Sequence, residues 1–111
     1  SNRYTIVLSP EIIKEILSVL YRAGLRERFP AMAEPPQLER VLRILEQAEV
    51  VEPAEKVSVC RDPNDDKFFE CALAGGADYI VSEDRDILDV GHYGGVKTVT
   101  AEEFVALLSV G

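Results

Sequence analysis

The sequence has few of the residues that build disulfide scaffolds or histidine-based sites. It contains two cysteines, one histidine and no tryptophan. Cys60 and Cys71 lack the two-residue separation of a redox or zinc pair and are too few for a disulfide scaffold. We expect both to be reduced packing residues, and His92, alone in a glycine-rich segment, to be structural or solvent-facing.

Long apolar runs are also absent. No segment approaches the ~20 uninterrupted apolar residues that a transmembrane helix needs, and the N-terminus lacks the basic-then-apolar pattern of a secretory signal. We therefore expect a cytoplasmic protein that does not associate with a membrane.

The composition indicates one folded domain. Hydrophobic residues make up 47% and charged residues 29% of 111 residues, which is enough for one core and too few for two. Twenty acidic residues against twelve basic ones give a net charge of −8. That charge argues against a nucleic-acid partner, because phosphate binding depends on lysine and arginine. A carboxylate cluster that holds a divalent cation is the exception, since the metal inverts the local charge.

Strand-like and helical segments alternate along the chain. The expected strands are 4–8, 50–51, 79–82 and 96–99. The expected helices are 10–24, 36–48, 66–74, a short one at 87–88, and 101–108 with a capping box at its start. Segments 25–29, 57–60, 62–66 and 91–95 are interpreted as a short helix or turn, an extended connection, an acidic turn and a loop. This alternation predicts a three-layer α/β/α domain with a mainly parallel sheet.

Acidic residues fall where the predicted strands meet helices. Asp84 and Asp86 follow strand 79–82, Asp66 opens a helix, and Glu15 lies about a turn and a half into the first helix. Ligands gather at the carboxyl ends of parallel strands, so these side chains are placed to converge. Clustered carboxylates are tolerated when a cation neutralises them, and oxygen-only sites favour Mg²⁺ or Mn²⁺. Such a site can hydrolyse a phosphodiester.

Each acid also has a purely structural interpretation. Asp66 and Asp84 favour a helix dipole simply by standing at helix N-termini. Asp62 and Asp65 fit the chemistry of a turn and a cap. Glu15 fits a half-exposed position on an amphipathic helix. Residue spacing alone therefore leaves a metal site undecided.

Three segments in combination resemble the PIN-domain family: TIVLSPEIIKEILSVL, CRDPNDDKFFECALAGGADYIVSEDRDIL and YGGVKTVTAEEFVALL. The resemblance runs from Tyr4 to Leu108 and points to toxin components of prokaryotic toxin–antitoxin systems related to VapC toxins. It implies a metal-dependent endoribonuclease, a parallel sheet between helices, and an acidic pocket for Mg²⁺ or Mn²⁺. The implied partners are an RNA substrate and a cognate antitoxin protein.

Matching motif positions assign roles to individual residues. The resemblance implies three catalytic metal ligands: Glu15, Asp66 and Asp84. Asp86 matches a frequently acidic position and is expected to assist in binding the metal. Ser82 matches a small hydroxyl residue beside the site and is expected to contact substrate. Glu83 stands where relatives usually have glycine, so it is expected to crowd the site or supply a substitute ligand.

One feature of the family pattern has no counterpart in these residues. Family members begin with a strand that ends in aspartate, followed by a helix, ahead of the segment at which this sequence starts. We therefore expect residues 1–111 to be a single PIN-like domain that lacks that strand and helix, and expect its activity to need the missing aspartate. Because the strand would be central, we expect the exposed edges to pair with another chain in a homodimer.

Two further functions stay open. A catalytically dead PIN-like interaction module would keep the fold and a partner surface without the chemistry. A phosphate-handling receiver-like or phosphatase-like α/β domain would also use aspartates at strand ends. That last alternative predicts an aspartate directly after the first strand, where this chain has Ser9 and Pro10.

Overall fold

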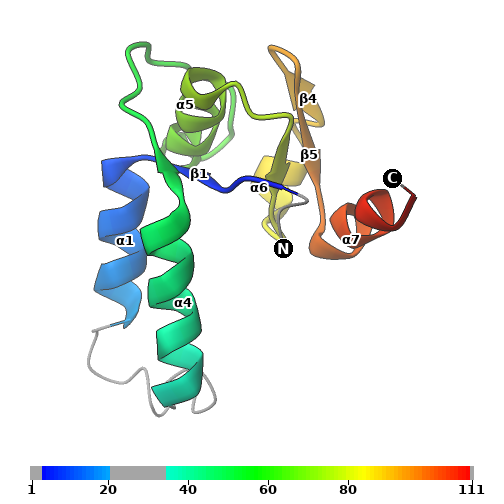
Figure 1. Ribbon diagram of the computed structural model, residues 1–111. Helices are drawn as coiled ribbons and strands as arrows, with labels where there is room; N and C mark the ends of the chain where they lie inside the picture. The colour runs from blue at the N-terminus through cyan, green and yellow to red at the C-terminus, as the bar shows by residue number, and fades with distance from the viewer. Residues whose placement is uncertain (1–3, 21–34, 111) are drawn as a thin grey trace.

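The computed structural model of the protein describes residues 4–20 and 35–110 (Figure 1). The end of the predicted helix 10–24 and the short helix or turn predicted at 25–29 fall outside these ranges. Within them, every helix is too short or too polar to cross a membrane.

The described elements alternate between strands and helices. They are β1 (Val7–Leu8), α1 (Pro10–Leu20), α4 (Pro35–Gln47), β2 (Glu49–Val50), the 3₁₀ helix η1 (Pro63–Asp65), α5 (Asp66–Gly75), β3 (Tyr79–Val81), α6 (Arg85–Leu88), β4 (His92–Tyr93), β5 (Val96–Val99) and α7 (Ala101–Val110). β1 and β3 are shorter than predicted, since of the segment 4–8 only the last two residues pair. β2 begins one residue earlier than predicted, and β5 has the predicted bounds. Mixed helices and parallel strands agree with the α/β class expected from the sequence.

The strands form two small sheets. In the first, β1 pairs in parallel with β2. In the second, β5 lies between β3, which is parallel to it, and β4, which is antiparallel. The prediction of a plain loop at 91–95 was wrong, because β4 and β5 form a hairpin. Gly94 and Gly95 have φ angles of 57° and 85°, the left-handed conformation that a tight two-residue hairpin turn needs.

Capping groups set where the helices begin and end. The Ser9 hydroxyl accepts a hydrogen bond from the Ile12 backbone N–H at 3.3 Å, at the start of α1. At the start of α7, Thr100 Oγ1 accepts from the Glu103 N–H at 3.1 Å, and Glu103 Oε1 accepts from the Thr100 N–H at 2.8 Å. These reciprocal bonds confirm the predicted capping box. Helix α5 ends at Gly76, with a left-handed φ of 63°.

Helix α5 lies at the centre of the core. It contacts β1 of one sheet, β3 and β5 of the other, and α1. Phe69 in α5 and Val96 in β5 are fully buried, and the Phe69 ring meets the edge of Tyr93 with 6.3 Å between ring centres. The same helix therefore supports both sheets.

One edge of β1 is unpaired. The carbonyl oxygens of Ile6 and Leu8 accept hydrogen bonds from the N–H groups of Glu49 and Val51, so these residues face β2. In a strand, the N–H and C=O groups of successive residues face opposite neighbouring strands. The N–H and C=O groups of Val7 therefore face away from β2. No described strand pairs with that side.

One edge of β3 is unpaired in the same way. The Asp78 carbonyl accepts from the Lys97 N–H, and the Ser82 N–H donates to the Val99 carbonyl. The main-chain groups of Tyr79 and Val81 therefore face away from β5. Among the described residues, no strand occupies that side either.

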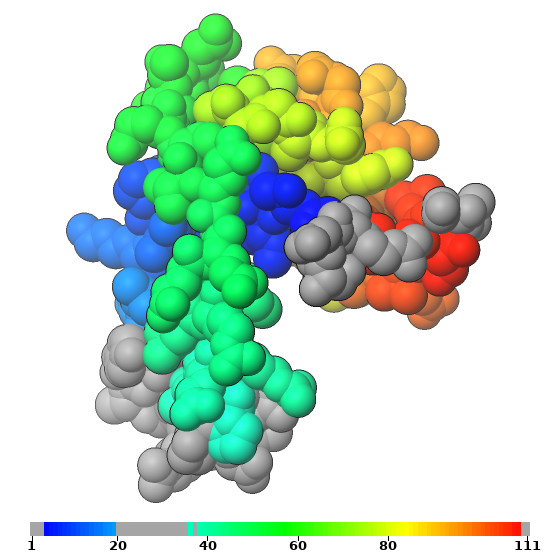
Figure 2. All heavy atoms as spheres, viewed as in Figure 1, coloured from blue at the N-terminus to red at the C-terminus, as the bar shows by residue number. Residues whose placement is uncertain are grey.

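The two unpaired edges border one groove. It has a volume of about 900 Å³ and is lined by β1, by β3 and by mostly apolar side chains of α1, α5 and α7. Figure 2 shows the blue segment that contains β1 between the green and cyan residues of α4 and the red C-terminal helix α7. We call this feature the strand groove. Residues of both short sheets therefore line the same groove.

The close contact between α5 and β1 gives a test of this packing. A Cβ added at Gly75 would overlap Cγ1 of Val7. We expect Gly75→Ala to lower the free energy of unfolding by about 1–3 kcal/mol, measured by urea denaturation, because overpacking forces the strand away from the helix. Adding Val7→Ala should recover part of that loss. Equal stability of Gly75→Ala and the parent chain would contradict the described contact.

Candidate metal centre

Three aspartates from two segments come together near the start of α5. Asp65 is the last residue of η1, Asp84 is the N-cap of α6, and Asp86 lies in the first turn of α6. One carboxylate oxygen of each lies within 4.8 Å of the other two. Among the described residues, this is the group of acids close enough to share a metal ion. We call it the aspartate cluster.

The turn after β3 fixes two members of the aspartate cluster. Asp84 Oδ1 accepts a hydrogen bond from the Asp86 N–H at 2.9 Å, and the Ser82 hydroxyl accepts from the Asp84 N–H at 3.0 Å. These short-range bonds tighten the chain, so Asp84 and Asp86 project from one turn. Ser82 was expected to contact substrate, and its hydroxyl here supports the turn.

Asp65 joins the cluster in place of the cap role predicted for it. It stands at the N-cap of α5 but makes no side-chain capping bond. Burial raises the pKa of its carboxyl, and the negative charges of Asp84, Asp62 and Asp86 raise it further. The sequence predicted a cap for Asp62 as well, and Asp62 does accept from the Asn64 N–H at 3.0 Å. Asp65 is thus left facing other acids.

A divalent cation would relieve this repulsion. All donors in the cluster are carboxylate oxygens, which suit hard ions such as Mg²⁺ or Mn²⁺. Two oxygens bound to one such ion at about 2.1 Å lie no more than about 4.2 Å apart. The chosen oxygens of the three aspartates lie within 4.8 Å of one another. A small movement of the side chains is therefore enough to bring them to the spacing that one ion needs. The residues present fit such an ion.

Asp66, predicted as a metal ligand, binds the protein backbone in this structure. It is buried, with 8% of its surface exposed, and its Oδ1 accepts hydrogen bonds from the N–H groups of Val59 at 3.1 Å and Cys60 at 2.9 Å. The bond from Cys60 lowers the pKa of this carboxyl most, and the bond from Val59 lowers it further, although burial opposes them. Asp66 holds the extended segment before η1 against α5.

Glu70, one helical turn beyond Asp66, repeats this arrangement. Its Oε2 accepts a hydrogen bond from the Val57 N–H at 3.1 Å, and the residue is buried. Together the two carboxylates accept the N–H groups of Val57, Val59 and Cys60, in an extended segment that belongs to no sheet. We call these contacts the α5 clamp.

Glu15 also lies outside the aspartate cluster. Its carboxylate pairs with the ammonium group of Lys67, in the first turn of α5. The Lys67 side chain is only 13% exposed, whereas that of Glu15 is 50% exposed. This ion pair ties α1 to the start of α5, next to Asp65 and Asp66.

The arrangement differs in composition from the predicted ligand set. The structure brings Asp84 and Asp86 together, adds Asp65, and leaves Glu15 and Asp66 outside the cluster. Asp66 remains close by: burial, Asp66, Asp65 and Asp86 together raise the pKa of the Cys60 thiol to about 12. Its position beside Asp66 in the sequence could have pointed to Asp65 as a ligand. The spacing of residues does not reveal, however, which of two neighbouring acids joins the cluster and which binds the backbone.

Glu83 does not enter the cluster. Its Oε2 accepts a hydrogen bond from the Ala101 N–H at 2.9 Å, at the beginning of α7. Glu83 therefore caps helix α7. In this structure it neither crowds the aspartate cluster nor supplies a ligand to it, contrary to the expectation from the sequence. His92 is exposed in β4.

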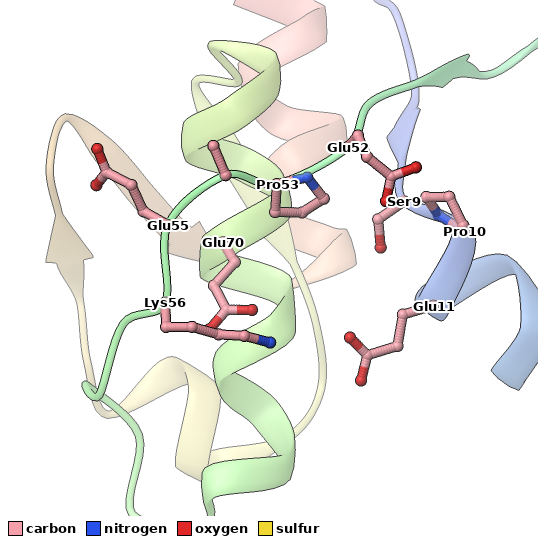
Figure 3. Close-up of a pocket in the computed structure, with 9 residues that line it drawn as sticks. Ser9, Pro10, Glu11, Glu52, Pro53, Glu55, Lys56 and Glu70 are labelled. Atoms are coloured by element: carbon pink, nitrogen blue, oxygen red, sulfur yellow. The ribbon is translucent and has the colours of Figure 1, made fainter.

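A second hollow lies beside Glu70, between the start of α1 and the segment 52–56 (Figure 3). Its volume of about 140 Å³ is below the roughly 300 Å³ at which small-molecule clefts begin. Figure 3 shows the Lys56 side chain extending toward the Glu11 carboxylate. The hollow has room for a few waters.

Comparison with protein families identifies the fold. A family model described as the PIN domain matches residues 1–86. The chain belongs to the PIN-domain family. The matched range includes the α5 clamp and all three acids of the aspartate cluster. Membership suggests a nuclease-like function, and PIN domains generally use a divalent metal. Neither the curated proteins nor the solved structures give a match to this chain.

The α5 clamp predicts a large effect of a small change at Asp66. Asp66→Asn removes the charge from a buried acceptor of two N–H groups, and we expect it to lower the free energy of unfolding by about 2 kcal/mol. Asp62→Asn is the control, because asparagine caps as well as aspartate and should change stability by only a few tenths of a kcal/mol.

The stability difference should depend on pH with a definite sign. Because the pKa of Asp66 is lowered in the fold, its stabilisation is present above the ordinary value of 3.8 and is lost as the pH falls through the lower, folded value. Urea denaturation of the parent and Asp66→Asn at several pH values should show the gap narrowing only below about pH 4. A gap that is constant down to pH 2 would contradict the clamp.

Proposed function

We propose that this PIN-domain chain is an endoribonuclease that holds Mg²⁺ or Mn²⁺ on the aspartate cluster and hydrolyses RNA phosphodiesters. The observation that carries this proposal is the convergence of the carboxylates of Asp65, Asp84 and Asp86. Burial raises the pKa of Asp65, and the charges of the neighbouring acids raise it further. Three carboxylates this close are stable together when a cation neutralises them.

The residues have separate roles in this proposal. A bound ion would supply Lewis acidity, which activates water and neutralises charge on the phosphate. Asp65, Asp84 and Asp86 hold and orient that ion. Ser82 keeps Asp84 in place through its backbone N–H.

Residues outside the cluster support its geometry. The α5 clamp fixes the chain that leads into η1 and therefore the position of Asp65. Glu15 and Lys67 join α1 to the same region. The family resemblance assigns Glu15 and Asp66 to the metal directly, and we place them as supports because their carboxylates are engaged elsewhere.

The biological setting rests on the family resemblance. We propose that the intact protein acts as the toxin of a toxin–antitoxin pair and is inhibited by a cognate antitoxin protein. The resemblance implies that RNA cleavage also needs a further aspartate from a preceding strand.

A Mn²⁺ titration tests the metal site. We expect the chain to bind Mn²⁺ in calorimetry, and we expect Asp84→Asn and Asp65→Asn each to weaken that binding by roughly tenfold or more, because each removes one charged ligand. Asp62→Asn lies next to the cluster without belonging to it and should bind as the parent does.

The titrations of these variants distinguish a specific metal site from general attraction of cations to an acidic surface. Equal weakening by Asp62→Asn and Asp84→Asn would show only a diffuse attraction of cations to acidic residues. Absence of Mn²⁺ binding in the parent chain would sink the proposal for these residues. Cleavage of a labelled single-stranded RNA, abolished by EDTA and by Asp84→Asn, is the matching activity readout.

A second candidate function is a strand-binding interaction module. The observation that favours it is the strand groove, whose lining includes residues of β1 and β3 with unpaired main-chain groups. One extended polypeptide in the groove can pair with Val7 on one side and with Tyr79 and Val81 on the other. We assign this role to an extended, apolar segment of the antitoxin.

The chemistry of the groove favours a polypeptide over a small molecule. Strands pair about 4.8 Å apart and satisfy N–H and C=O groups in register, which a small apolar ligand cannot do along two edges at once. Apolar residues such as Ile12, Ile16 and Phe104 line the groove. The occupant therefore needs apolar side chains toward the core.

Amide exchange tests the groove. We expect an eight-residue peptide of alternating valine and threonine to slow exchange at the amides of Val7, Tyr79 and Val81, because these become paired. The same peptide with two prolines, which cannot complete the ladder, is the control. Sedimentation at several concentrations determines whether a second copy fills the groove instead.

The results decide between occupants. Slower exchange with the peptide alone supports a strand from a partner protein. Concentration-dependent protection without peptide, with a sedimenting dimer, would assign the groove to the homodimer expected from the sequence. Unchanged exchange in a monomer under all conditions would contradict strand binding.

A further inference from the structure

Arg61 lies at the rim of the aspartate cluster. We propose that its guanidinium binds a phosphate of the RNA strand beside the metal ion, an inference that rests on the proposed function. Arg61 Nε lies 3.7 Å from Asp86 Oδ1, an acid of the cluster, and its Nη2 lies 3.5 Å from Asp89 Oδ2.

The backbone around Arg61 is fixed while its side chain is open. Cys60, the preceding residue, donates its N–H to Asp66 in the α5 clamp, and Asp62, the following residue, caps η1. The Arg61 side chain is nevertheless 77% exposed. A cation is therefore presented to solvent from a rigid base, directly beside the proposed metal ligands.

Binding of an RNA phosphate by this acidic chain needs a local positive charge. The chain has a net charge of −8, and a polyanion binds mainly through lysine and arginine. Lys67, in the first turn of α5, pairs its ammonium group with Glu15, and its side chain is only 13% exposed. Arg85 is exposed but makes no ion pair with the described acids, whereas Arg61 contacts Asp86 of the cluster. Arg61 is therefore the best placed of the three to meet a phosphate beside the ion.

The geometry of guanidinium explains how Arg61 can hold both an acid and a phosphate. Its five N–H donors lie in a plane, and the long contacts to Asp86 and Asp89 involve only Nε and Nη2. If the Asp86 carboxylate held an ion, its attraction for Arg61 would be weaker. Arg61 could then keep its contact with Asp89 and offer its remaining donors to a phosphate.

The arrangement predicts opposite effects of Arg61 on the two ligands. Removing a positive charge beside the cluster should leave Mn²⁺ binding unchanged or tighter, because Arg61 competes with the cation for Asp86. RNA binding should weaken, because a charge-assisted contact to phosphate is lost. A residue that merely stabilises the fold would weaken both.

The test compares Arg61→Ala with Arg85→Ala. Arg85 is an exposed arginine on α6, between Asp84 and Asp86 in sequence, and makes no ion pair with the described residues. Binding of a labelled single-stranded RNA is measured by fluorescence anisotropy at several salt concentrations, with Ca²⁺ present in place of the catalytic ion. Mn²⁺ affinity is measured separately by calorimetry, and folding by urea denaturation.

We expect Arg61→Ala to weaken RNA binding about tenfold and to reduce the salt slope of log K by about 0.7, the contribution of one phosphate contact on a single strand. Arg85→Ala should preserve the slope. Arg61→Lys should retain the slope but only part of the affinity, because lysine lacks the planar fork.

Different results would contradict the role of Arg61 and the existence of the metal site. If Mn²⁺ binds and depends on Asp84, but Arg61→Ala and Arg85→Ala bind RNA equally well, the role of Arg61 is overturned and the metal site stands. If the parent binds no Mn²⁺, the proposed function fails first. A loss of both RNA and Mn²⁺ binding in Arg61→Ala would also overturn the proposal, by showing a structural role.

Discussion

The structure depends on two buried carboxylates that hold a segment of chain in place of a neighbouring strand. Asp66 and Glu70 accept N–H groups of Val57, Val59 and Cys60, which would otherwise need a sheet partner. Charged acceptors make these bonds stronger than neutral ones, and removing either acid would leave N–H groups without a partner. The path of the chain into η1, and with it the placement of Arg61 and Asp65, follows from these contacts.

The same few residues therefore serve stability and the candidate chemistry. The Asp66 carboxylate accepts two backbone hydrogen bonds. Its neighbour Asp65 makes no side-chain capping bond and lies with Asp84 and Asp86. Its pKa is raised because it is partly buried among like charges, while that of Asp66 is lowered because N–H groups surround it. Two adjacent aspartates thus occupy opposite electrostatic environments, one suited to structure and the other to a cation.

The sequence predicted what depends on local chemistry. The alternation of strand-like and helical segments, together with the capping box at Thr100, was sufficient to place most helices, because these signals depend on residues close together in the chain. The hairpin of β4 and β5 was missed, since a two-residue strand has no periodicity to detect. The parallel pairings of β1 with β2 and of β3 with β5 agree with the predicted class.

The candidate site was predictable only in part. Asp84 and Asp86 follow a recognisable strand, so their common location could be inferred from the sequence. The choice between Asp65 and Asp66 depends on which side chain meets the backbone of Val59 and Cys60, a long-range fact that no motif carries. The roles of Glu15 and Glu83 likewise follow from partners distant in sequence, Lys67 and Ala101.

Helix α5 has a consequence that links distant parts of the molecule. It contacts β1 and β3, which border the strand groove, and its N-terminus carries Asp65. A polypeptide bound in the strand groove would therefore lie against the helix that carries Asp65 at its N-cap. Through this one helix, occupation of the groove and the position of Asp65 relative to Asp84 and Asp86 are mechanically linked.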